Sequence, residues 1–208
     1  MSSLKITGAI LAGGQSRRLG RDKASMPLQG KPLALWVAEA LAPWVSECWL
    51  LTNQPQAHLS FGLPLFTDLK PLQGPLGGLQ TAMFLAGGPL ILAAAVDAPF
   101  LASPILEALI SRAGQGVSAP VVCRTSRGLQ PFPGVYPVTL LPRLTEFLKT
   151  GRHVRRFLEQ CHAETLPQEE VARLDPEGRS FFNLNTPEEL EQAAAWLTAG
   201  GAGLSPSS

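Results

Sequence analysis

Two apolar segments constrain the fold of this chain more than any other feature. Residues 5–11 (KITGAIL) and 89–96 (PLILAAAV) run almost without polar interruption. A strand with one face in water would alternate apolar and polar residues, whereas a parallel strand covered on both faces is apolar throughout. Both segments are therefore expected to be buried parallel strands. Further strands are expected at residues 47–52, 63–67, 117–122 and 134–136.

Helical patterns separate these strands. One helix is expected from Lys31, with Pro32 in the first helical position, and others from Gly74 and from Ser103, which would be the N-cap. Further helices are expected at 140–149, 154–160 and 186–197, and the last begins with a capping box formed by Thr186 and Glu189. Alternating strands and helices predict an α/β three-layer sandwich, in which a mostly parallel, Rossmann-like sheet has helices on both faces. We expect a single domain over residues 1–197 and a flexible tail over 198–208.

The composition excludes several classes of protein. Seventeen basic and sixteen acidic side chains among 208 residues give a net charge of +1, so no overall field would attract nucleic acid or an anionic membrane. The three cysteines lack the spacing of a metal site, so reduced thiols are expected. The first apolar run is too short for a signal or a membrane span. These features predict a cytoplasmic protein.

The segment LAGGQSRRLGRDK, residues 11–23, follows the first predicted strand. Its glycines allow the backbone to approach a ligand closely, and Arg17, Arg18 and Lys23 add positive charge. Together they favour a polyphosphate site, although the spacing fits neither a Walker A loop nor a dinucleotide fingerprint. The alternative is a basic surface loop with turn glycines.

Scarce carboxylates and amides also follow predicted strands. The chain has four aspartates, of which Asp97 is well placed to hold Mg²⁺ and Asp68 to accept a hydrogen bond from a base or ribose. The alternatives are a helix or turn cap for Asp97 and a turn role for Asp68. Asn183 and Asn185 either present their amides to the site or, for Asn185, serve as a turn residue before the last helix.

These segments, taken in order, resemble the molybdenum cofactor guanylyltransferases, a family with the nucleotidyltransferase fold. The first loop carries the family's LAGG-x-S-x-R and D-K elements, and the remaining matches are GKPL from Gly30, GPLGG from Gly74, VDAPF from Val96, QPFPGVY from Gln130, and NLNTPEEL from Asn183. They extend over nearly the whole chain, and together they are specific. The resemblance implies a sheet of the nucleotide-diphospho-sugar transferase type.

The resemblance also implies a reaction and the residues that perform it. GMP would pass from GTP to the phosphate of molybdenum-loaded molybdopterin, with release of pyrophosphate. Residues 1–100 would bind GTP and residues 101–197 the pterin. The implied GTP contacts are Leu11, Ala12, Gly13, Gly14, Arg18, Lys23, Asp68, Gly74, Pro75, Leu76 and Asp97. Among these, Arg18, Lys23 and Asp97 would be catalytic, and Asp97 would hold Mg²⁺. The implied pterin-side residues are Gln130, Pro131, Asn183 and Asn185, together with Arg152 or Arg155.

Other functions remain open at this stage. The nearest are transfer of CMP to the same pterin and transfer of a nucleotide to a sugar or cobinamide phosphate. Gly13 stands where cytidylyl enzymes usually have alanine, and Asp22 where sugar nucleotidyltransferases usually have proline. A different class is a protein that binds the nucleotide or the mature cofactor for delivery without turnover. Transient contacts with other cofactor-biosynthesis proteins or recipient apoenzymes are a further expectation.

Overall fold

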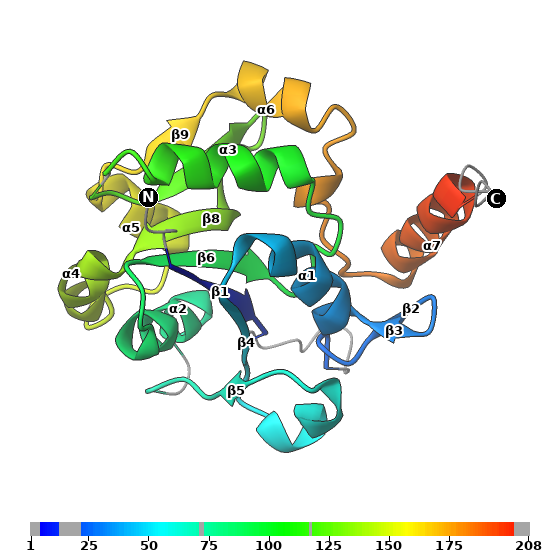
Figure 1. The fold of residues 1–208 in the computed structure, drawn as a ribbon, viewed down its shortest axis with the longest axis horizontal. Helices are drawn as coiled ribbons and strands as arrows, with labels where there is room; N and C mark the ends of the chain where they lie inside the picture. The colour runs from blue at the N-terminus through cyan, green and yellow to red at the C-terminus, as the bar shows by residue number, and fades with distance from the viewer. Residues whose placement is uncertain (1–4, 13–21, 71–72, 117, 202–208) are drawn as a thin grey trace.

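The fold is organised around one seven-stranded sheet (Figure 1). The computed structural model describes residues 5–12, 22–70, 73–116 and 118–201. The strands lie in the order β5-β4-β1-β6-β8-β7-β9, and β8 is the one strand antiparallel to its neighbours. The predicted mostly parallel sheet is confirmed. The strands are β1 (Ile6–Leu11), β4 (Glu47–Leu51), β5 (Leu65–Phe66), β6 (Leu90–Ala95), β7 (Val121–Thr125), β8 (Gly128–Pro137) and β9 (Glu164–Leu166).

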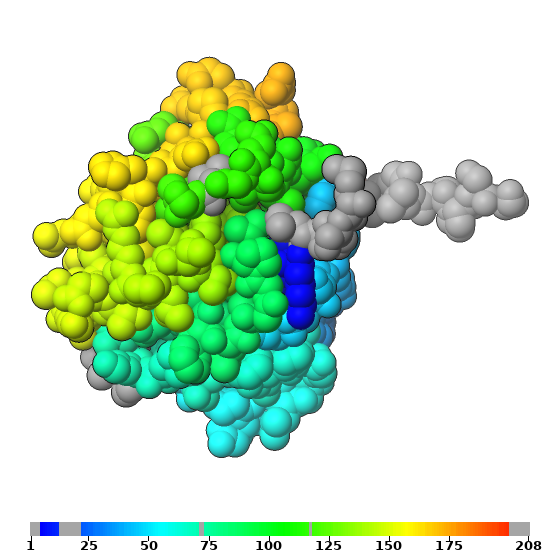
Figure 2. All heavy atoms as spheres, turned by 60° about the vertical axis from the view of Figure 1, so that its left-hand side comes forward, coloured from blue at the N-terminus to red at the C-terminus, as the bar shows by residue number. Residues whose placement is uncertain are grey.

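Helices cover both faces of this sheet, as the sequence predicts. One face packs against α1 (Leu33–Leu41), α3 (Ser103–Ala113) and α6 (Gln168–Leu174). The other packs against α2 (Pro75–Leu85), α4 (Leu141–Phe147) and α5 (Val154–Gln160). Figure 2 shows α4 and α5 as a yellow-green and yellow flank of the surface.

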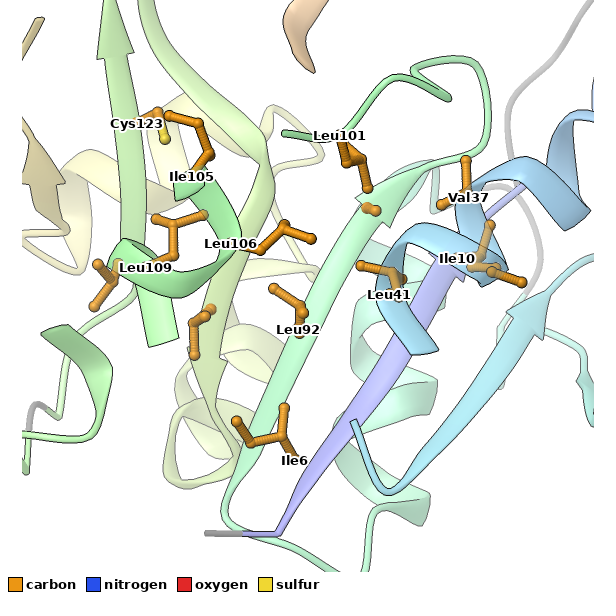
Figure 3. Packing of buried hydrophobic residues seen from close by; sticks show 14 of the residues in the cluster. Ile6, Ile10, Val37, Leu41, Leu92, Leu101, Ile105, Leu106, Leu109 and Cys123 are labelled. Atoms are coloured by element: carbon orange, nitrogen blue, oxygen red, sulfur yellow. The ribbon is translucent and has the colours of Figure 1, made fainter. Parts of the chain in front are cut away.

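The two faces have separate hydrophobic cores because successive strand residues point in opposite directions. Ile10 and Leu92 pack toward α1 and α3, where Leu41 and Leu106 meet them (Figure 3). Leu11, the next residue along β1, belongs to the core under α2. Continuous apolar strands are thus explained by burial on both sides.

Helices α1 and α3 do not begin as the sequence predicts. Lys31–Pro32 forms strand β3, which pairs with β2 (Pro27–Leu28), so α1 begins at Leu33. Pro32 is the N-cap of α1 and not its first residue, because its ψ of 143° is extended. Ser103 is the first residue of α3 and not its N-cap. The N-cap is Ala102, whose N–H donates to the Ser180 hydroxyl.

The strands expected at 117–122 and 134–136 are longer or shifted, and they correspond to β7 and β8. The prolines at the start of β8 fall where its pairing with β7 changes register. Val122 pairs with Gly134 and Cys123 with Gln130, so residues 131–133 have no partner in β7. Such a bulge tolerates prolines because no ladder hydrogen bond is required there. Strand β9 and helix α6 were not predicted.

The last helix, α7 (Pro187–Gly201), continues four residues past its expected end at residue 197 and so includes the start of the predicted tail. Its capping box is confirmed: the Thr186 N–H donates to Glu189 at 2.9 Å, and the Glu189 N–H donates to the Thr186 hydroxyl at 3.2 Å. Phe100 and Phe182 pack against Trp196, with ring centroids 5.6 and 4.8 Å away. Residues 202–208 of the predicted tail lie outside the described part of the chain.

The described residues also contain four 3-10 segments: η1 (Ala42–Trp44), η2 (Pro55–Phe61), η3 (Val138–Leu140) and η4 (Arg179–Phe181). Among the described residues, no helix combines the length and apolar character needed to cross a membrane.

Candidate active site

The carboxyl ends of the parallel strands meet at one edge of the sheet. Ala12, just past β1, donates its N–H to the Leu51 carbonyl at 2.9 Å, and Val96 donates to the Leu11 carbonyl at 3.2 Å. Because β8 runs in the opposite direction, its beginning lies at this same edge. The topology therefore brings residues from both halves of the chain together, at the edge where open α/β sheets bind ligands.

Three predicted side chains converge at this edge. The Lys23 ammonium lies 2.6 Å from Asp97 Oδ2 and 2.6 Å from Asn185 Oδ1. The Lys23 and Asp97 side chains are 18% and 20% exposed, so the ion pair is largely sheltered but open to a ligand. The segment carrying Asn185 is also tied to Asp97 through its backbone, since the Leu184 N–H donates to the Asp97 carbonyl at 2.8 Å.

A hydrogen bond from its backbone also holds Asn185 in place. The Asn185 N–H donates to the Glu189 carboxylate at 2.6 Å, the same carboxylate that caps α7. Asn185 is therefore both the turn residue before the helix and a side chain facing Lys23. The two alternatives left open by the sequence are combined in one residue.

A second group of polar residues surrounds Asp68. Its carboxylate accepts a hydrogen bond from Asn53 Nδ2 at 3.0 Å, and its N–H donates to Asn53 Oδ1 at 3.3 Å. Burial raises the pKa of the Asp68 carboxyl, and the hydrogen bond from Asn53 offsets only part of that effect. Asp68 Oδ1 is buried without a hydrogen-bond partner in the described structure. It is an acceptor suited to a donor from a ligand. The sequence placed Asn53 at a strand end but assigned it no role.

The GPLGG segment brings the start of α2 close to Asp68. Gly74 precedes the helix with φ 63°, a conformation that favours glycine. A Cβ on Gly77 would lie 2.7 Å from Gln73 Cβ and 3.1 Å from Asp68 Oδ2. Leu76, in contrast, has its side chain fully buried in the core under α2. Any contact from Leu76 to a nucleotide would therefore have to come from its backbone.

The turn that carries Lys23 is organised by Asp22. Its carboxylate accepts hydrogen bonds from the Ala24 N–H at 3.2 Å and from the Ser25 hydroxyl at 2.7 Å, and it contacts His58 Nε2. Burial raises the pKa of Asp22, but the hydrogen bonds from Ser25 and His58 outweigh it, so the net pKa is lowered. The Asp-Lys-Ala-Ser sequence could have predicted this turn. Nothing in it could have predicted the wholly buried His58, which comes from η2.

Part of the predicted phosphate loop is not covered by the structure. Gly13, Gly14, Arg17 and Arg18 lie outside the described residues. Leu11 and Ala12 were expected to contact the nucleotide through their backbone. The Ala12 N–H is not free to do so, because it donates to the Leu51 carbonyl. Amides for a phosphate would therefore have to come from later in the loop.

The residues of β8 that the sequence predicts on the pterin side are held by internal hydrogen bonds. Gln130 Nε2 donates to the Thr125 hydroxyl at 2.9 Å, and the buried Tyr136 hydroxyl donates to the Pro131 carbonyl at 2.6 Å. Asn183 lies two residues before Asn185, and its carbonyl accepts a weak contact from the Asn185 amide at 3.5 Å. Arg152 and Arg155 are both exposed.

The oxygen atoms of Asp97 and Asn185 fit a Mg²⁺ ion that takes most of its other ligands from substrate phosphates and water. Carboxylate and amide oxygens of Asp97 and Asn185 both face the position of one cationic group, the Lys23 ammonium. Within the described ranges, no three His, Cys, Asp or Glu side chains gather into a metal cluster. Mg²⁺ does not require such a cluster, because it commonly binds through one or two carboxylates, substrate phosphates and water.

This fold and site define a nucleotidyltransferase. A solved structure with the same arrangement, molybdopterin-guanine dinucleotide biosynthesis protein A from Archaeoglobus fulgidus, has a TM-score of 0.80 and 26% identity over 93% of this chain and 99% of that one. A second, a CMP:2-keto-3-deoxy-manno-octonic acid synthetase complexed with CTP, has a TM-score of 0.70 at 16% identity over 96% of this chain and 100% of that one, which shows the shared fold alone.

The chain belongs to the family of the MobA-like NTP transferase domain, whose model matches residues 8–166. The molybdenum cofactor guanylyltransferase of Cereibacter sphaeroides is 36% identical over 201 residues, which cover 93% of this chain and 98% of that protein. The molybdenum cofactor guanylyltransferase of Desulfosudis oleivorans is 31% identical over 197 residues, covering 94% and 97%. The family resemblance inferred from the motifs is thereby confirmed.

Proposed function

We propose that this protein transfers GMP from GTP to the phosphate of molybdenum-loaded molybdopterin, releasing pyrophosphate and forming the guanine dinucleotide cofactor. One observation carries the proposal: Lys23 lies 2.6 Å from both Asp97 in the nucleotide half and Asn185 in the acceptor half. Two phosphate groups must meet during the transfer, and this contact joins the two halves at a cationic group. The names of the relatives support guanine as the base and the pterin as the acceptor.

The reaction needs no general base from the protein. A phosphate monoester has a second pKa of about 6, so the acceptor is largely dianionic near neutral pH. One of its oxygens attacks the α-phosphorus of GTP, and the bond from that phosphorus to the oxygen bridging the β-phosphate breaks. Pyrophosphate leaves with the electron pair. The protein has to align two anions and offset their repulsion.

The predicted site residues would share these tasks. The Lys23 ammonium would stabilise charge on the triphosphate and on the departing pyrophosphate, together with Arg18 and amides of Gly13 and Gly14. Asp97 would hold Mg²⁺, which supplies Lewis-acid charge stabilisation when bound. Asp68 would accept a hydrogen bond from the nucleoside beside Gly74 and Pro75. On the acceptor side, Gln130, Pro131, Asn183 and Asn185 would position the pterin.

The proposal extends to partners and location. The small-molecule substrates are GTP and the loaded pterin, and the product is consumed by enzymes that require the dinucleotide. We therefore propose transient contacts with proteins of cofactor synthesis or recipient apoenzymes, in the cytoplasm.

Nucleotide preference tests the base, and product release tests the reaction. With Mg²⁺, GTP at about 100 times its Kd stabilises the fold by about 2.7 kcal/mol. For a chain of this size that corresponds to a Tm increase of about 5–10 °C. CTP, ATP and UTP should give less. Stabilisation by CTP alone would overturn the guanylyl assignment, and GTP binding without pyrophosphate release in the presence of loaded molybdopterin would indicate a binding protein.

Asp97→Asn gives a matched test of the metal ligand. The substitution keeps the shape of the side chain but removes its charge, so we expect Mg²⁺-dependent turnover to fall by at least about 100-fold. Glu177→Gln makes the same chemical change on an exposed carboxylate that pairs with Arg179, and turnover should not change. Equal behaviour of the two variants would argue against Asp97 as the ligand.

A further inference from the structure

A buried histidine stands behind the turn that carries Lys23. His58 is 0% exposed, and its Nε2 contacts the Asp22 carboxylate. Its ring packs beside Phe61, with centroids 5.1 Å apart. His58 Nδ1 is buried and has no hydrogen-bond partner among the residues that the structure describes. An unsatisfied ring nitrogen is unfavourable, so packing alone would be served better by phenylalanine at this position.

The Asp22 carboxylate, which His58 contacts, also holds the other residues of this turn. The Asp22 carboxylate also accepts the Ala24 N–H, the Ser25 N–H and the Ser25 hydroxyl. The turn closes with a hydrogen bond from the Met26 N–H to the Lys23 carbonyl at 3.2 Å. Asp22 is therefore fixed on one side by its own turn and on the other by His58.

The side chains of Asp22 and Lys23, which are adjacent in this turn, contact different parts of the molecule. Asp22 is held toward η2, whereas Lys23 extends to Asp97 and Asn185 at 2.6 Å. Lys23 has a long and flexible side chain, and the start of that side chain is set by the backbone of the turn. Fixing the backbone at Asp22 reduces the positions that the ammonium can occupy.

We infer that His58 is a positioning residue that acts through Asp22 to hold Lys23 at the phosphate site. The inference rests on the proposed function, because Lys23 is the group that acts on the phosphates. Because its side chain is fully buried, His58 would act without contacting a ligand. Its effect is expected on the transition state, where the ammonium has to be aligned, more than on the binding of GTP.

The test compares two substitutions of one residue. His58→Phe keeps an aromatic ring beside Phe61 but removes the nitrogen that meets Asp22. We expect kcat for pyrophosphate release to fall by about 10-fold to 100-fold, with KM for GTP within about 3-fold of the wild type. His58→Gln retains an N–H donor at a comparable reach, so kcat should return to within about 3-fold. His162→Phe, the same change at an exposed histidine, is the control and should leave kcat unchanged.

A double-mutant cycle separates positioning from a general structural effect. If His58 acts through Lys23, His58→Phe causes no further loss of kcat in a Lys23→Ala background. An equal loss in both backgrounds, or a His58→Gln variant no better than His58→Phe, would overturn the inference. Ser25→Ala removes another donor to Asp22 and gives a second cycle if His58→Phe does not fold; it should show the same dependence on Lys23.

The inference remains testable if the proposed function fails. Should the wild type release no pyrophosphate with any nucleotide, the probe becomes inorganic triphosphate with Mg²⁺, measured as a shift in Tm. His58→Phe should lower that shift by about 1–3 °C, which is what a roughly 3-fold weaker ground-state binding would give. His58→Gln should restore the shift, and neither substitution should matter in the Lys23→Ala background. A shift that His58→Phe leaves intact would contradict the positioning role.

Discussion

Gly77→Ala tests whether the glycines of the GPLGG segment serve close packing around Asp68. Gly77 lies in the first turn of α2, where a Cβ would come within 2.7 Å of Gln73 Cβ and 3.1 Å of Asp68 Oδ2. Real Cβ contacts essentially never fall under 3.0 Å, so Gln73 has to move, and Asp68 has to shift by a few tenths of an ångström. The substitution should therefore perturb both the fold and the proposed nucleoside contact of Asp68.

Two opposing effects set the size of the stability change. Replacing glycine by alanine in a helix favours folding by at most about 1 kcal/mol, and less in the first turn. Overpacking costs about 1–3 kcal/mol. The net loss is then about 1 kcal/mol, which lowers Tm by about 2–4 °C in a protein of this length. Displacing Asp68 would also weaken the hydrogen bond that we propose it accepts from the nucleoside, so the Kd for GTP should increase by about 10-fold.

Calorimetry and GTP titration measure the two effects on one sample. Gly114→Ala is the matched control, because Gly114 is exposed at the end of α3 and its Cβ would approach the Ile110 carbonyl no closer than 3.3 Å. It should change stability by no more than about 0.5 kcal/mol and leave the Kd unchanged. A Gly77→Ala protein with wild-type Tm and wild-type affinity would refute the packing argument.

Three further predictions concern charge, capping and thiols. Asp68→Asn should stabilise the free protein near neutral pH. Burial raises the pKa of Asp68, so the contribution of this group to wild-type stability is fully present below its unfolded pKa of 3.8 and is lost as the pH rises through the higher folded-state pKa. The difference in Tm between Asp68→Asn and the wild type should shrink toward pH 4, and a constant difference would contradict this. Glu189→Ala should destabilise α7 by about 1 kcal/mol, because it removes the capping carboxylate, which urea unfolding would detect. Burial raises the pKa of Cys48 and of Cys123 to about 12, so both should resist iodoacetamide at pH 8 until the protein is unfolded, as mass spectrometry can check.

Much of the fold follows from local sequence, but pairing partners do not. The span of α5 and the capping box of α7 agree with the sequence, since both depend on residues close together in the chain. Strand β8 was predicted only at residues 134–136, and the prolines that precede this segment, Pro131 and Pro133, are unfavourable in a paired strand. Only the register of β7 shows that these prolines lie where no partner is needed.

The site divides in the same way. Strand ends and scarce residue types identified Lys23, Asp97 and Asn185, and the structure brings their side chains together. Asn53 and His58 were not assigned because their roles depend on contacts with Asp68 and Asp22, which lie 15 and 36 residues away in the chain. A residue that acts through another leaves no local pattern for sequence to read.

The turnover of Lys23→Ala measures the central claim most directly. With GTP, Mg²⁺ and molybdenum-loaded molybdopterin, loss of the ammonium should lower the rate of pyrophosphate release by about 100-fold or more. Lys149→Ala, which removes an exposed lysine paired with Glu146, should release pyrophosphate at the wild-type rate. A Lys23→Ala enzyme as fast as the Lys149→Ala control would contradict the account.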